Sequence, residues 1–449
     1  MSKPGHPENT FYKYKYFFMM LKYILQITFI FLVKKRILEH DMSETIIERP
    51  YYLQRLAEYR QNGLIKVILG PRRCGKSFLL EMYQAKLIKE GIAPNQIVAV
   101  NLDDFDSRNL RKASELHRHV LEKCSDSCTY YVFIDEIQMC SGFQDVLSSF
   151  SRHRNLDIYV TGSNAFLLSG ELVTFLTGRY TEIRMSTLSF AEFHQACKDD
   201  GLSAHDDLLR YMQIGGFPAV VPYRNNPRSI QDYYDGLVSS IILKDICYRL
   251  KVRDAALLDR LSVCLATSIG SVVSPKNLMN VLKSDGIDIS LPTIYTYLQA
   301  LEDSFFFLRV PRFDVRGKAA LRSEEKFYLC DTGFRYSITS TPVRDYGRIL
   351  ENIVYLELVR RYKKVSIGRV GQSEIDFVAE SSDGFAYYQV AMSVLDSGTL
   401  DRELAPFKAI RDAFPRYLIT ADTIGAGRNF EGVKQVNAAE WLLTNTGCN

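Results

Sequence analysis

The stretch LIKVILGPRRCGKS, residues 64–77, predicts the first part of the fold. Its first seven residues form a short, nearly continuous apolar run, which is typical of a strand buried on both faces of a parallel sheet. The remainder, GPRRCGKS, matches the pattern GxxxxGK[ST] in full, and a helical pattern follows it. The stretch therefore predicts a strand, a phosphate-binding loop and the start of a helix.

The residues of this loop each suit a part of phosphate binding. Gly75 allows the backbone to curl so that successive N–H groups point at phosphate oxygens, and the start of the following helix adds its positive dipole end. Lys76 is expected to reach the β- and γ-phosphates of ATP, and the Ser77 hydroxyl is expected to ligate Mg²⁺. A chance glycine-rich turn is the alternative, but the strand–loop–helix context argues against it. The expected nucleotide-binding residues are Gly70, Pro71, Arg72, Arg73, Cys74, Gly75, Lys76, Ser77 and Phe78.

A second apolar run carries an acidic pair that complements this loop. In VFIDEIQ (132–138), Asp135 ends the run and Glu136 follows it. Asp135 can hold the hydration shell of Mg²⁺, and Glu136 can polarise the attacking water. By itself the pair could simply cap a strand. Together with the upstream loop it predicts ATP hydrolysis, with Lys76 and Glu136 among the catalytic groups.

Two further polar residues are candidates for the same site. YVTGSNAF (159–166) ends another apolar run with Asn164, where a polar group would lie between the phosphate loop and the acidic pair. A strand-ending turn explains Asn164 equally well. LTGRY (176–180) contains Arg179, whose guanidinium could neutralise charge on the γ-phosphate of its own chain or of a neighbouring one. A surface arginine without a catalytic role is the alternative.

Apolar runs alternate with helical patterns through the first two hundred residues. This alternation predicts an α/β fold with a parallel sheet and helices on both faces. The further expected strands are 97–102, 130–135, 157–162 and one within 181–193, and the expected helices lie near 77–90, 107–123 and 141–153.

The middle of the chain has a different pattern. Residues 203–250 read as helical, with a break at GGFP (215–218). A β-hairpin is expected after three further helices, which gives the outline of a winged helix. These three helices are expected at 254–267, 275–284 and 292–303.

Winged helices often place their third helix in the DNA major groove, but the charge of this segment argues against that use. The third expected helix, LPTIYTYLQALED (291–303), contains no Lys or Arg and ends in two acids. Residues 255–315 hold five basic and six acidic side chains. Because phosphate contacts dominate DNA affinity and need positive charge, a packing or protein-binding module is favoured.

The stretch EIDFVAESSDGFAYYQVAM (374–392) looks like half of a metal-dependent nuclease site. Such a site takes a glutamate from a helix, an aspartate from one strand, and a carboxylate and a lysine two residues apart from the next strand. Glu351 and Asp376 fill the first two places, whereas Gln389 and Ala391 stand in the last two. Two of the four groups are therefore lost.

A cation from another position is the one way to restore such a site. Arg402 and Lys408, on a helix expected over 400–413, are the candidates. Without them nuclease activity is not expected, and the remaining polar side chains would form a structural hydrogen-bond network.

The motifs of the chain, in their order and spacing, resemble those of a known family. They are GPRRCGKS, FIDEIQ, TGSN, LTGRY with LSFAEF, IGGFPAV and FYLCDTGF. The chain is similar to prokaryotic AAA-type P-loop ATPases that carry a C-terminal restriction-endonuclease-like domain of unknown function. The resemblance covers essentially all of residues 42–449. It implies an AAA-like parallel sheet, a winged-helix middle region and an α/β nuclease-like end, and no defined cellular role.

These patterns together predict three domains after an N-terminal extension. Residues 42–200 would form the ATPase domain, residues 201–320 a helical and winged-helix region, and residues 321–449 an inactive nuclease-like domain.

Residues 1–41 form the expected extension. Their apolar segment 16–33 is barely long enough to span a bilayer and contains Lys22, so it would be at most a weak membrane anchor. The alternative is a non-native extension, because Met42 opens a stretch that reads as a start of its own.

Charge and cysteine usage narrow the class of protein further. Of 56 basic and 52 acidic residues, seven and three lie in residues 1–41, which leaves 49 of each in residues 42–449. This neutral body lacks the electrostatic signal of a nucleic-acid binder. The nine cysteines are odd in number and scattered without convincing zinc spacing, as in a reduced, cytoplasmic protein.

The sequence thus predicts an AAA-type ATPase that hydrolyses ATP with Mg²⁺ to drive a conformational or partner-binding switch. An ATP-regulated DNA-processing protein or nuclease is the alternative. An unidentified protein partner is expected, and self-association is left open. Charge does not support DNA as a partner.

Overall fold

The computed structural model describes residues 46–165, 176, 178–247, 255–317, 319–339 and 345–444. The expected N-terminal extension and its apolar segment lie outside these residues. The chain forms two compact units, and residues 70–74 and 163–166 group with the second unit, which otherwise begins at residue 186. Within the described ranges, no helix is both long enough and apolar enough to cross a membrane.

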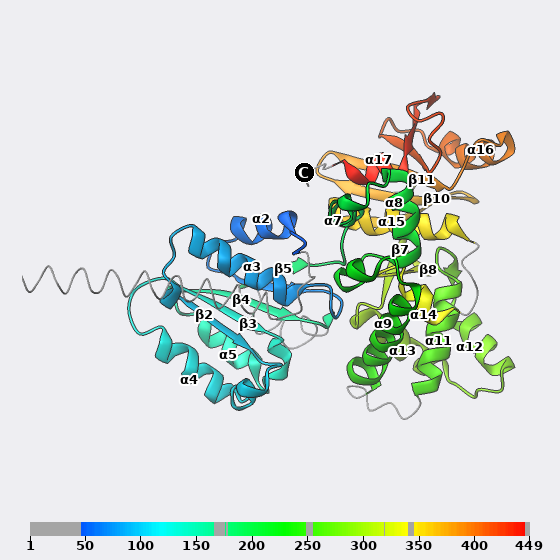
Figure 1. The fold of residues 1–449 in the computed structure, drawn as a ribbon. Coiled ribbons are helices and arrows are strands. Elements are labelled where there is room, and N and C mark those ends of the chain that lie inside the picture. The colour runs from blue at the N-terminus through cyan, green and yellow to red at the C-terminus, as the bar shows by residue number, and fades with distance from the viewer. Residues whose placement is uncertain are drawn as a thin grey trace, which may run out of the picture. The chain divides into compact units, whose positions relative to one another are not determined.

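The first unit contains a sheet of five parallel strands, as the sequence predicts (Figure 1). Every residue of β1, β3 and β4 is buried, because helices cover both faces of the sheet. The strands lie in the order β2-β3-β4-β1-β5. Their bounds are β1 (Ile65–Leu69), β2 (Ile97–Asn101), β3 (Tyr130–Asp135), β4 (Leu156–Gly162) and β5 (Tyr180–Arg184).

Helices flank this sheet on two sides (Figure 1). One side carries α2 (Pro50–Glu58) and α3 (Lys76–Lys89), which pack against each other. The other side carries α4 (Ala113–Lys123) and α5 (Phe143–Phe150), which also contact each other. The predicted helices near 77–90, 107–123 and 141–153 are therefore confirmed, with one difference. The second begins as a separate short 3₁₀ helix, η2 (Phe105–Arg111).

A buried ion pair joins two neighbouring strands of this sheet. Lys66 on β1 contacts Asp157 on β4, and the two side chains are 0% and 3% exposed. The Tyr159 hydroxyl donates a second hydrogen bond to Asp157 at 2.8 Å. Burial lowers the pKa of Lys66, and Asp157 opposes this effect. The pair favours one register of β1 beside β4. The apolar pattern of the two strands does not predict it.

The second unit begins with helices and continues into three helices and a hairpin, as predicted. The predicted break at GGFP falls between α8 and η6. The first group is α7 (Phe190–Ala196), η5 (Lys198–Asp200), α8 (Ala204–Ile214), η6 (Pro218–Tyr223), α9 (Pro227–Ser240) and the π-helix η7 (Ile241–Cys247). The second group is α11 (Ala255–Thr267), β6 (Val272–Val273), α12 (Pro275–Ser284), α13 (Leu291–Asp303), β7 (Phe307–Asp314) and β8 (Ala319–Leu329).

The hairpin belongs to a mixed sheet of nine strands that reaches almost to the end of the chain. Its order is β13-β14-β12-β11-β10-β9-β7-β8-β6, and β7 pairs with β9 in parallel. The expected boundary between residues 320 and 321 falls inside β8, so the sheet continues across it. The remaining strands are β9 (Lys364–Val370), β10 (Ser373–Ser381), β11 (Gly384–Ala391), β12 (Arg416–Thr420), β13 (Asn429–Phe430) and β14 (Val433–Asn437).

Four helices accompany this sheet, and one of them corrects a prediction. They are α14 (Phe334–Ile338), α15 (Tyr346–Arg361), α16 (Ser397–Leu404) and α17 (Ala438–Leu443). The single helix expected over 400–413 is wrong, because α16 ends at Leu404 and a 3₁₀ turn, η8 (Ala405–Ala409), follows. Pro406 explains the change, since proline has no N–H to donate and its ring opposes a continuing α-helix.

Two motifs of the second unit, IGGFPAV and FYLCDTGF, pack against each other. Asp331, 1% exposed, accepts hydrogen bonds from the N–H groups of Gly216 at 2.8 Å and Gly333 at 2.9 Å. A Cβ atom at Gly215, where φ is +75°, would lie 1.9 Å from a carboxylate oxygen of Asp331. The glycines are therefore needed for close approach, and these motifs have a structural role.

Candidate functional site

The phosphate-binding loop leaves the carboxyl end of β1 and ends where α3 begins at Lys76. Gly75 has a φ of +103° and Arg73 a φ of +63°, so the loop twice adopts the left-handed conformation. Alternation of this kind turns successive N–H groups toward one point and forms an anion-binding concavity. The N–H of Leu79 bonds to the carbonyl of Gly75 at 2.9 Å, which closes the first turn of α3.

Asp135 at the end of β3 meets the start of α3, as the sequence predicts. Its side chain is 7% exposed and is hydrogen-bonded to Ser77 and Thr161. Burial raises the pKa of Asp135, whereas these hydrogen bonds and the nearby Lys76 ammonium favour its ionised form. The structure thus brings together a hydroxyl, a carboxylate and an ammonium group.

Glu136 follows in a backbone conformation that side-chain-bearing residues rarely adopt. Its φ and ψ are +54° and +50°. Its N–H donates to the Thr161 hydroxyl oxygen at 2.9 Å, and the Gln138 side-chain amide donates to its carboxylate. Left-handed backbone at a non-glycine residue costs about 1–2 kcal/mol, and such strain is concentrated at functional sites.

Thr161 on β4 is a member of this cluster that the sequence analysis missed. Its hydroxyl donates to Asp135 and accepts the N–H of Glu136. The signal was present in the motif TGSN, where Thr161 precedes Asn164 by three residues. A threonine inside a buried strand also reads as an ordinary β-former, so the motif alone does not indicate this role.

Asn164 lies where the sequence analysis expects it along the chain. It follows the carboxyl end of β4, and β4 lies between β3 and β1 in the sheet. The chain therefore leaves the sheet at Asn164 between the strand that carries Asp135 and the strand that precedes the phosphate loop. Its catalytic role stays a prediction.

Arg179 lies at the opposite edge of the sheet. It precedes β5, and its carbonyl accepts a hydrogen bond from the N–H of Ile65 at 2.9 Å, at the amino end of β1. The phosphate loop follows the carboxyl end of β1, five residues further on, or about 16 Å at the rise of a strand. The structure therefore does not bring Arg179 to the loop of its own chain. A role on a neighbouring copy stays a prediction.

The remaining side chains of the loop differ in their surroundings. Arg72 pairs with Asp245 of η7 at 3.0 Å, and the Arg73 guanidinium lies 5.9 Å from the centre of the Tyr233 ring. Both partners belong to the same unit as residues 70–74. Gly70, Pro71 and Cys74 are buried, whereas Phe78 is 43% exposed in the first turn of α3.

The donor set at this site fits Mg²⁺. Ser77 and Asp135 offer hard oxygen atoms, which Mg²⁺ prefers, and Mg²⁺ usually keeps several waters and takes other ligands from phosphates. No group of three or more His, Cys, Asp or Glu suited to a metal occurs in the described part of the chain.

The C-terminal acidic residues form a second polar cluster, built around a lysine that the sequence analysis did not single out. Lys326 on β8 is 3% exposed and lies 3.1 Å from a carboxylate oxygen of Glu351 and 2.6 Å from one of Glu374. The Tyr328 hydroxyl also donates to Glu351. Burial raises the pKa of Asp376, and the neighbouring Glu351 adds to this effect.

The two positions that lack nuclease groups have other partners. The Gln389 amide donates to Glu403 at 2.9 Å, and its oxygen accepts the N–H of Asp376 at 3.2 Å. Ala391 contributes to the apolar core of this unit. Arg402 pairs with Glu403 while 73% exposed, and Lys408 is exposed. Neither of these two therefore supplies the replacement cation, whereas Lys326 brings a cation to Glu351.

These features define the class of protein. A parallel sheet that has a strand–loop–helix phosphate site after β1 and an Asp-Glu pair at the end of β3 is the AAA-type P-loop fold. A family model described as an AAA domain matches residues 62–194. A second model, described as a domain of unknown function (DUF8612), matches residues 205–345.

Relatives extend over most of the chain. An uncharacterized protein of Haemophilus influenzae is 36% identical over 405 residues, which are 90% of this chain and 100% of the relative. The chain belongs to the family of that protein. An uncharacterized protein of Methanocaldococcus jannaschii is 30% identical over 312 residues, 66% of this chain and 67% of the relative.

Solved structures resemble the chain more distantly. A Walker-type ATPase of Pyrococcus abyssi is 16% identical, with a TM-score of 0.45, over 64% of this chain and 95% of that one. The ORC1 protein of Aeropyrum pernix, solved in complex with DNA, is 13% identical, with a TM-score of 0.31, over 64% of this chain and 90% of that one.

Proposed function

We propose that the protein is an ATPase that requires Mg²⁺. The observation that carries this proposal is the contact between Ser77, at the start of α3, and Asp135, at the end of β3, with Glu136 next to it. A phosphate loop alone would support binding. The acidic pair at the end of β3 supports hydrolysis, because a carboxylate next to the metal-binding aspartate can act on a water molecule.

Each side chain has a distinct part in this proposal. The loop N–H groups and Lys76 bind the phosphates, and Ser77 and Asp135 would hold Mg²⁺. When bound, Mg²⁺ supplies positive charge against the phosphate oxygens. Glu136 accepts a hydrogen bond from the attacking water and orients it toward the γ-phosphorus. Asn164 would contact the γ-phosphate, and Arg179 would act only on a neighbouring copy.

Steady-state phosphate release tests these roles. Wild-type protein should release phosphate from ATP with Mg²⁺ and stop when the metal is chelated. Lys76→Ala should weaken nucleotide binding at least tenfold, and Glu136→Gln should lower kcat by about 10²–10⁴-fold, as expected for loss of a general base. Full activity of Glu136→Gln would refute the assignment of Glu136.

We further propose that hydrolysis changes how the second unit engages a protein partner. Two helices of that unit contact the loop directly: η7 through Asp245 and α9 through Tyr233. A γ-phosphate near Arg72 would compete with Asp245 for the guanidinium. The nucleotide state would therefore change the ion pair that holds η7 to the loop. The partner is expected to be a protein, and its identity is open.

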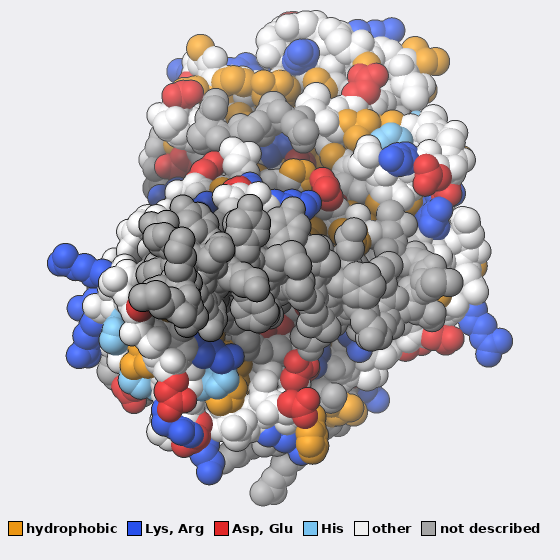
Figure 2. Space-filling model, turned by 60° about the vertical axis from the view of Figure 1, so that its left-hand side comes forward, with side chains coloured by type: hydrophobic (Ala, Val, Ile, Leu, Met, Phe, Trp, Pro, Cys, Tyr) orange, Lys and Arg blue, Asp and Glu red, His pale blue; other side chains and the backbone are white. Residues whose placement is uncertain are grey.

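Nuclease activity is the second candidate, because Lys326 places a cation beside Glu351, as such a site needs. Two observations argue against it. The Lys326 ammonium is already paired with two carboxylates, and neither Gln389 nor Ala391 can replace the lost groups. On the face that Figure 2 shows, the described Lys and Arg side chains are interspersed with Asp and Glu, which offers little to a nucleic-acid backbone. We therefore propose that this region is inactive. Plasmid nicking with Mg²⁺ or Mn²⁺ that disappears in Asp376→Ala would overturn this view.

A further inference from the structure

Thr161 stands between the two acidic residues of the candidate site. Its side chain is 0% exposed and lies on β4, next to β3 in the sheet. The hydroxyl donates to one carboxylate oxygen of Asp135 and accepts the N–H of Glu136 at 2.9 Å. A threonine hydroxyl offers one donor and two acceptor positions, so it can make both bonds at once.

We propose that Thr161 is a positioning residue that sets the geometry of both acidic side chains for metal binding and hydrolysis. This inference rests on the function proposed above. Through the first bond, Thr161 limits rotation of the Asp135 carboxylate, so that this group presents a fixed edge toward Ser77. Through the second bond, it holds the backbone of Glu136 and thereby the direction in which the Glu136 carboxylate points.

The backbone of Glu136 explains why a second bond is needed. A left-handed backbone is disfavoured for a residue with a side chain, and a hydrogen bond to its N–H offsets part of that cost. Without Thr161 the residue would gain access to ordinary backbone conformations. In those conformations the Glu136 side chain would point in a different direction. The bond therefore opposes relaxation of the strained residue.

If the Thr161 hydroxyl served folding alone, its hydrogen-bond partners would lie outside the candidate site. The hydroxyl of Thr161 instead bonds to two groups of the acidic pair, from two consecutive residues. Tyr159 and Asp157, on the same face of β4, bond to each other and to Lys66 and not to the acidic pair. The hydroxyl is therefore the specific feature, and a side chain of the same shape without it separates the two roles.

Three variants and two readouts test this inference. Thr161→Val keeps the shape and loses the hydroxyl, Thr161→Ser keeps the hydroxyl, and Thr161→Ala provides a second hydroxyl-free variant if Val disturbs folding. The first readout is the gain in affinity for a non-hydrolysable ATP analogue when Mg²⁺ is added. The second is kcat and KM for ATP, with the melting temperature measured beside them.

In Val and Ala, the Mg²⁺-dependent gain in affinity should fall about tenfold and kcat about 10- to 100-fold, as expected for loss of hydrogen bonds to charged groups. Affinity for the analogue without Mg²⁺ and KM should change less than about threefold. Serine should restore both readouts.

The two readouts separate failure of this inference from failure of the proposed function. If the wild type releases no phosphate but Val still loses the Mg²⁺-dependent gain, the ATPase proposal fails and Thr161 keeps its positioning role. The inference itself is overturned by a folded Val variant with wild-type gain and kcat, by a Ser variant as impaired as Val, or by a wild type that shows no Mg²⁺-dependent gain.

Discussion

At Glu136 the backbone adopts an unfavourable conformation at a residue with a proposed catalytic role. Its left-handed backbone is unfavourable, and only neighbouring groups keep it there. Strain of this kind persists where the surrounding structure over-determines it, and it often has a functional reason. At Glu136 the reason would be the aim of its carboxylate, since a glycine would relieve the strain but carry no side chain.

This interpretation predicts that activity and stability oppose each other at Glu136. Glu136→Gly should be more stable than Glu136→Gln by about 1 kcal/mol, because glycine adopts positive φ without steric cost. Both variants should be inactive, so their difference reports the backbone alone. Urea midpoints of the two variants measure it. A glycine variant less stable than the glutamine variant would show that the backbone is not strained.

At this scale the sequence identifies residues that sit in a contiguous motif and misses those that act across strands. Lys76 and Ser77 are recognisable because their spacing follows from the loop chemistry, and Asp135 because it ends an apolar run and is followed by a second acid. Thr161 and Lys326 are not, since their contacts depend on which strands become neighbours. A polar residue within an apolar run is the available signal, and it gives no information about the partner.

Lys326 on β8 and Glu351 on α15 link two elements of the second unit. Burial lowers the pKa of Lys326, but Glu351, Asp376 and Glu374 more than compensate and raise it above its ordinary value. The ammonium therefore stays charged and balances a group of carboxylates that would otherwise repel one another. This balance explains how an acidic cluster is retained in a region where nuclease groups are lost.

Loss of this lysine should therefore destabilise the second unit. Lys326→Met would leave partly buried carboxylates without their counter-charge, at a cost of up to about 3–5 kcal/mol. Lys364→Met is the matched control, because Lys364 pairs with Glu380 in the same sheet while about half exposed, and such pairs contribute about 0–1 kcal/mol. Chemical denaturation measures both. Equal effects would contradict the role given to Lys326.

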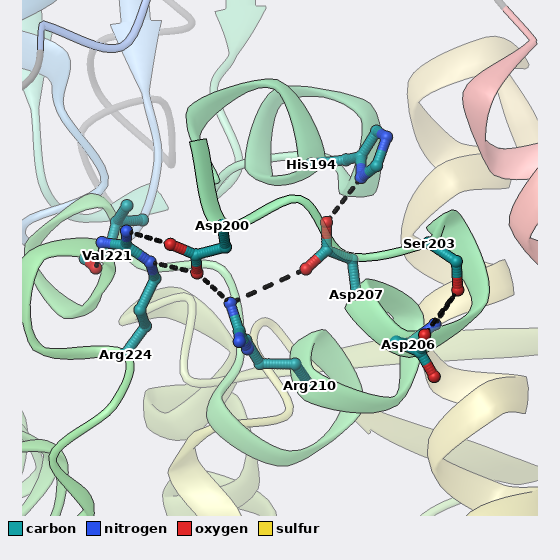
Figure 3. Close-up of polar contacts among 8 residues, drawn as sticks. All are labelled: His194, Asp200, Ser203, Asp206, Asp207, Arg210, Val221 and Arg224. Carbon is teal, nitrogen blue, oxygen red and sulfur yellow. Dashed lines mark hydrogen bonds and ion pairs between the residues drawn. The ribbon is translucent and has the colours of Figure 1, made fainter. Parts of the chain in front are cut away.

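An ion-pair cluster joins η5 and α8 to Arg224, the residue that follows η6, near the start of the second unit (Figure 3). Asp200 of η5 accepts hydrogen bonds from Arg224 at 2.6 and 2.8 Å and pairs with Arg210 of α8. The Arg224 hydrogen bonds, followed by those of Arg210, lower the pKa of Asp200 against the effect of burial. The ionised form of Asp200 is therefore the one that stabilises this packing.

The sign of the shift sets a pH dependence. A carboxyl whose pKa is lowered by folding stabilises the protein above its unfolded pKa, about 3.9, and loses this effect as pH falls below that value toward the folded pKa. Asp200→Asn should cost about 1–3 kcal/mol at pH 7, and the difference from wild type should shrink below pH 4. Urea unfolding at several pH values measures this change.

Asp206 provides the control for that experiment. It lies on α8, is exposed, and bonds to Ser203 rather than to an arginine (Figure 3). Asp206→Asn should change stability by less than about 0.5 kcal/mol at either pH. A difference for Asp200→Asn that does not depend on pH would show that the charge of Asp200 is not what matters.

Over the whole molecule, the two sheets differ in how far the sequence predicts them. The parallel sheet follows largely from apolar runs that alternate with helices, because β1 to β4 are each recognisable as such a run, whereas the polar β5 is not. The nine-stranded sheet could not be predicted as one body. Its continuity depends on the pairing of β7 with β9, which are separated in the chain by β8, α14 and α15, and β9 itself has no strong apolar run.

In the proposed mechanism one set of residues binds ATP, and a different residue, Glu136, orients the water that cleaves it. A single-turnover measurement distinguishes these two roles. Each protein is mixed with less than one equivalent of ATP and Mg²⁺, separated quickly from free nucleotide, and its bound nucleotide is identified. We expect ADP on wild type, ATP on Glu136→Gln and little nucleotide on Lys76→Ala. Conversion of ATP by Glu136→Gln at the wild-type rate, or retention of ATP by Lys76→Ala, would contradict this mechanism.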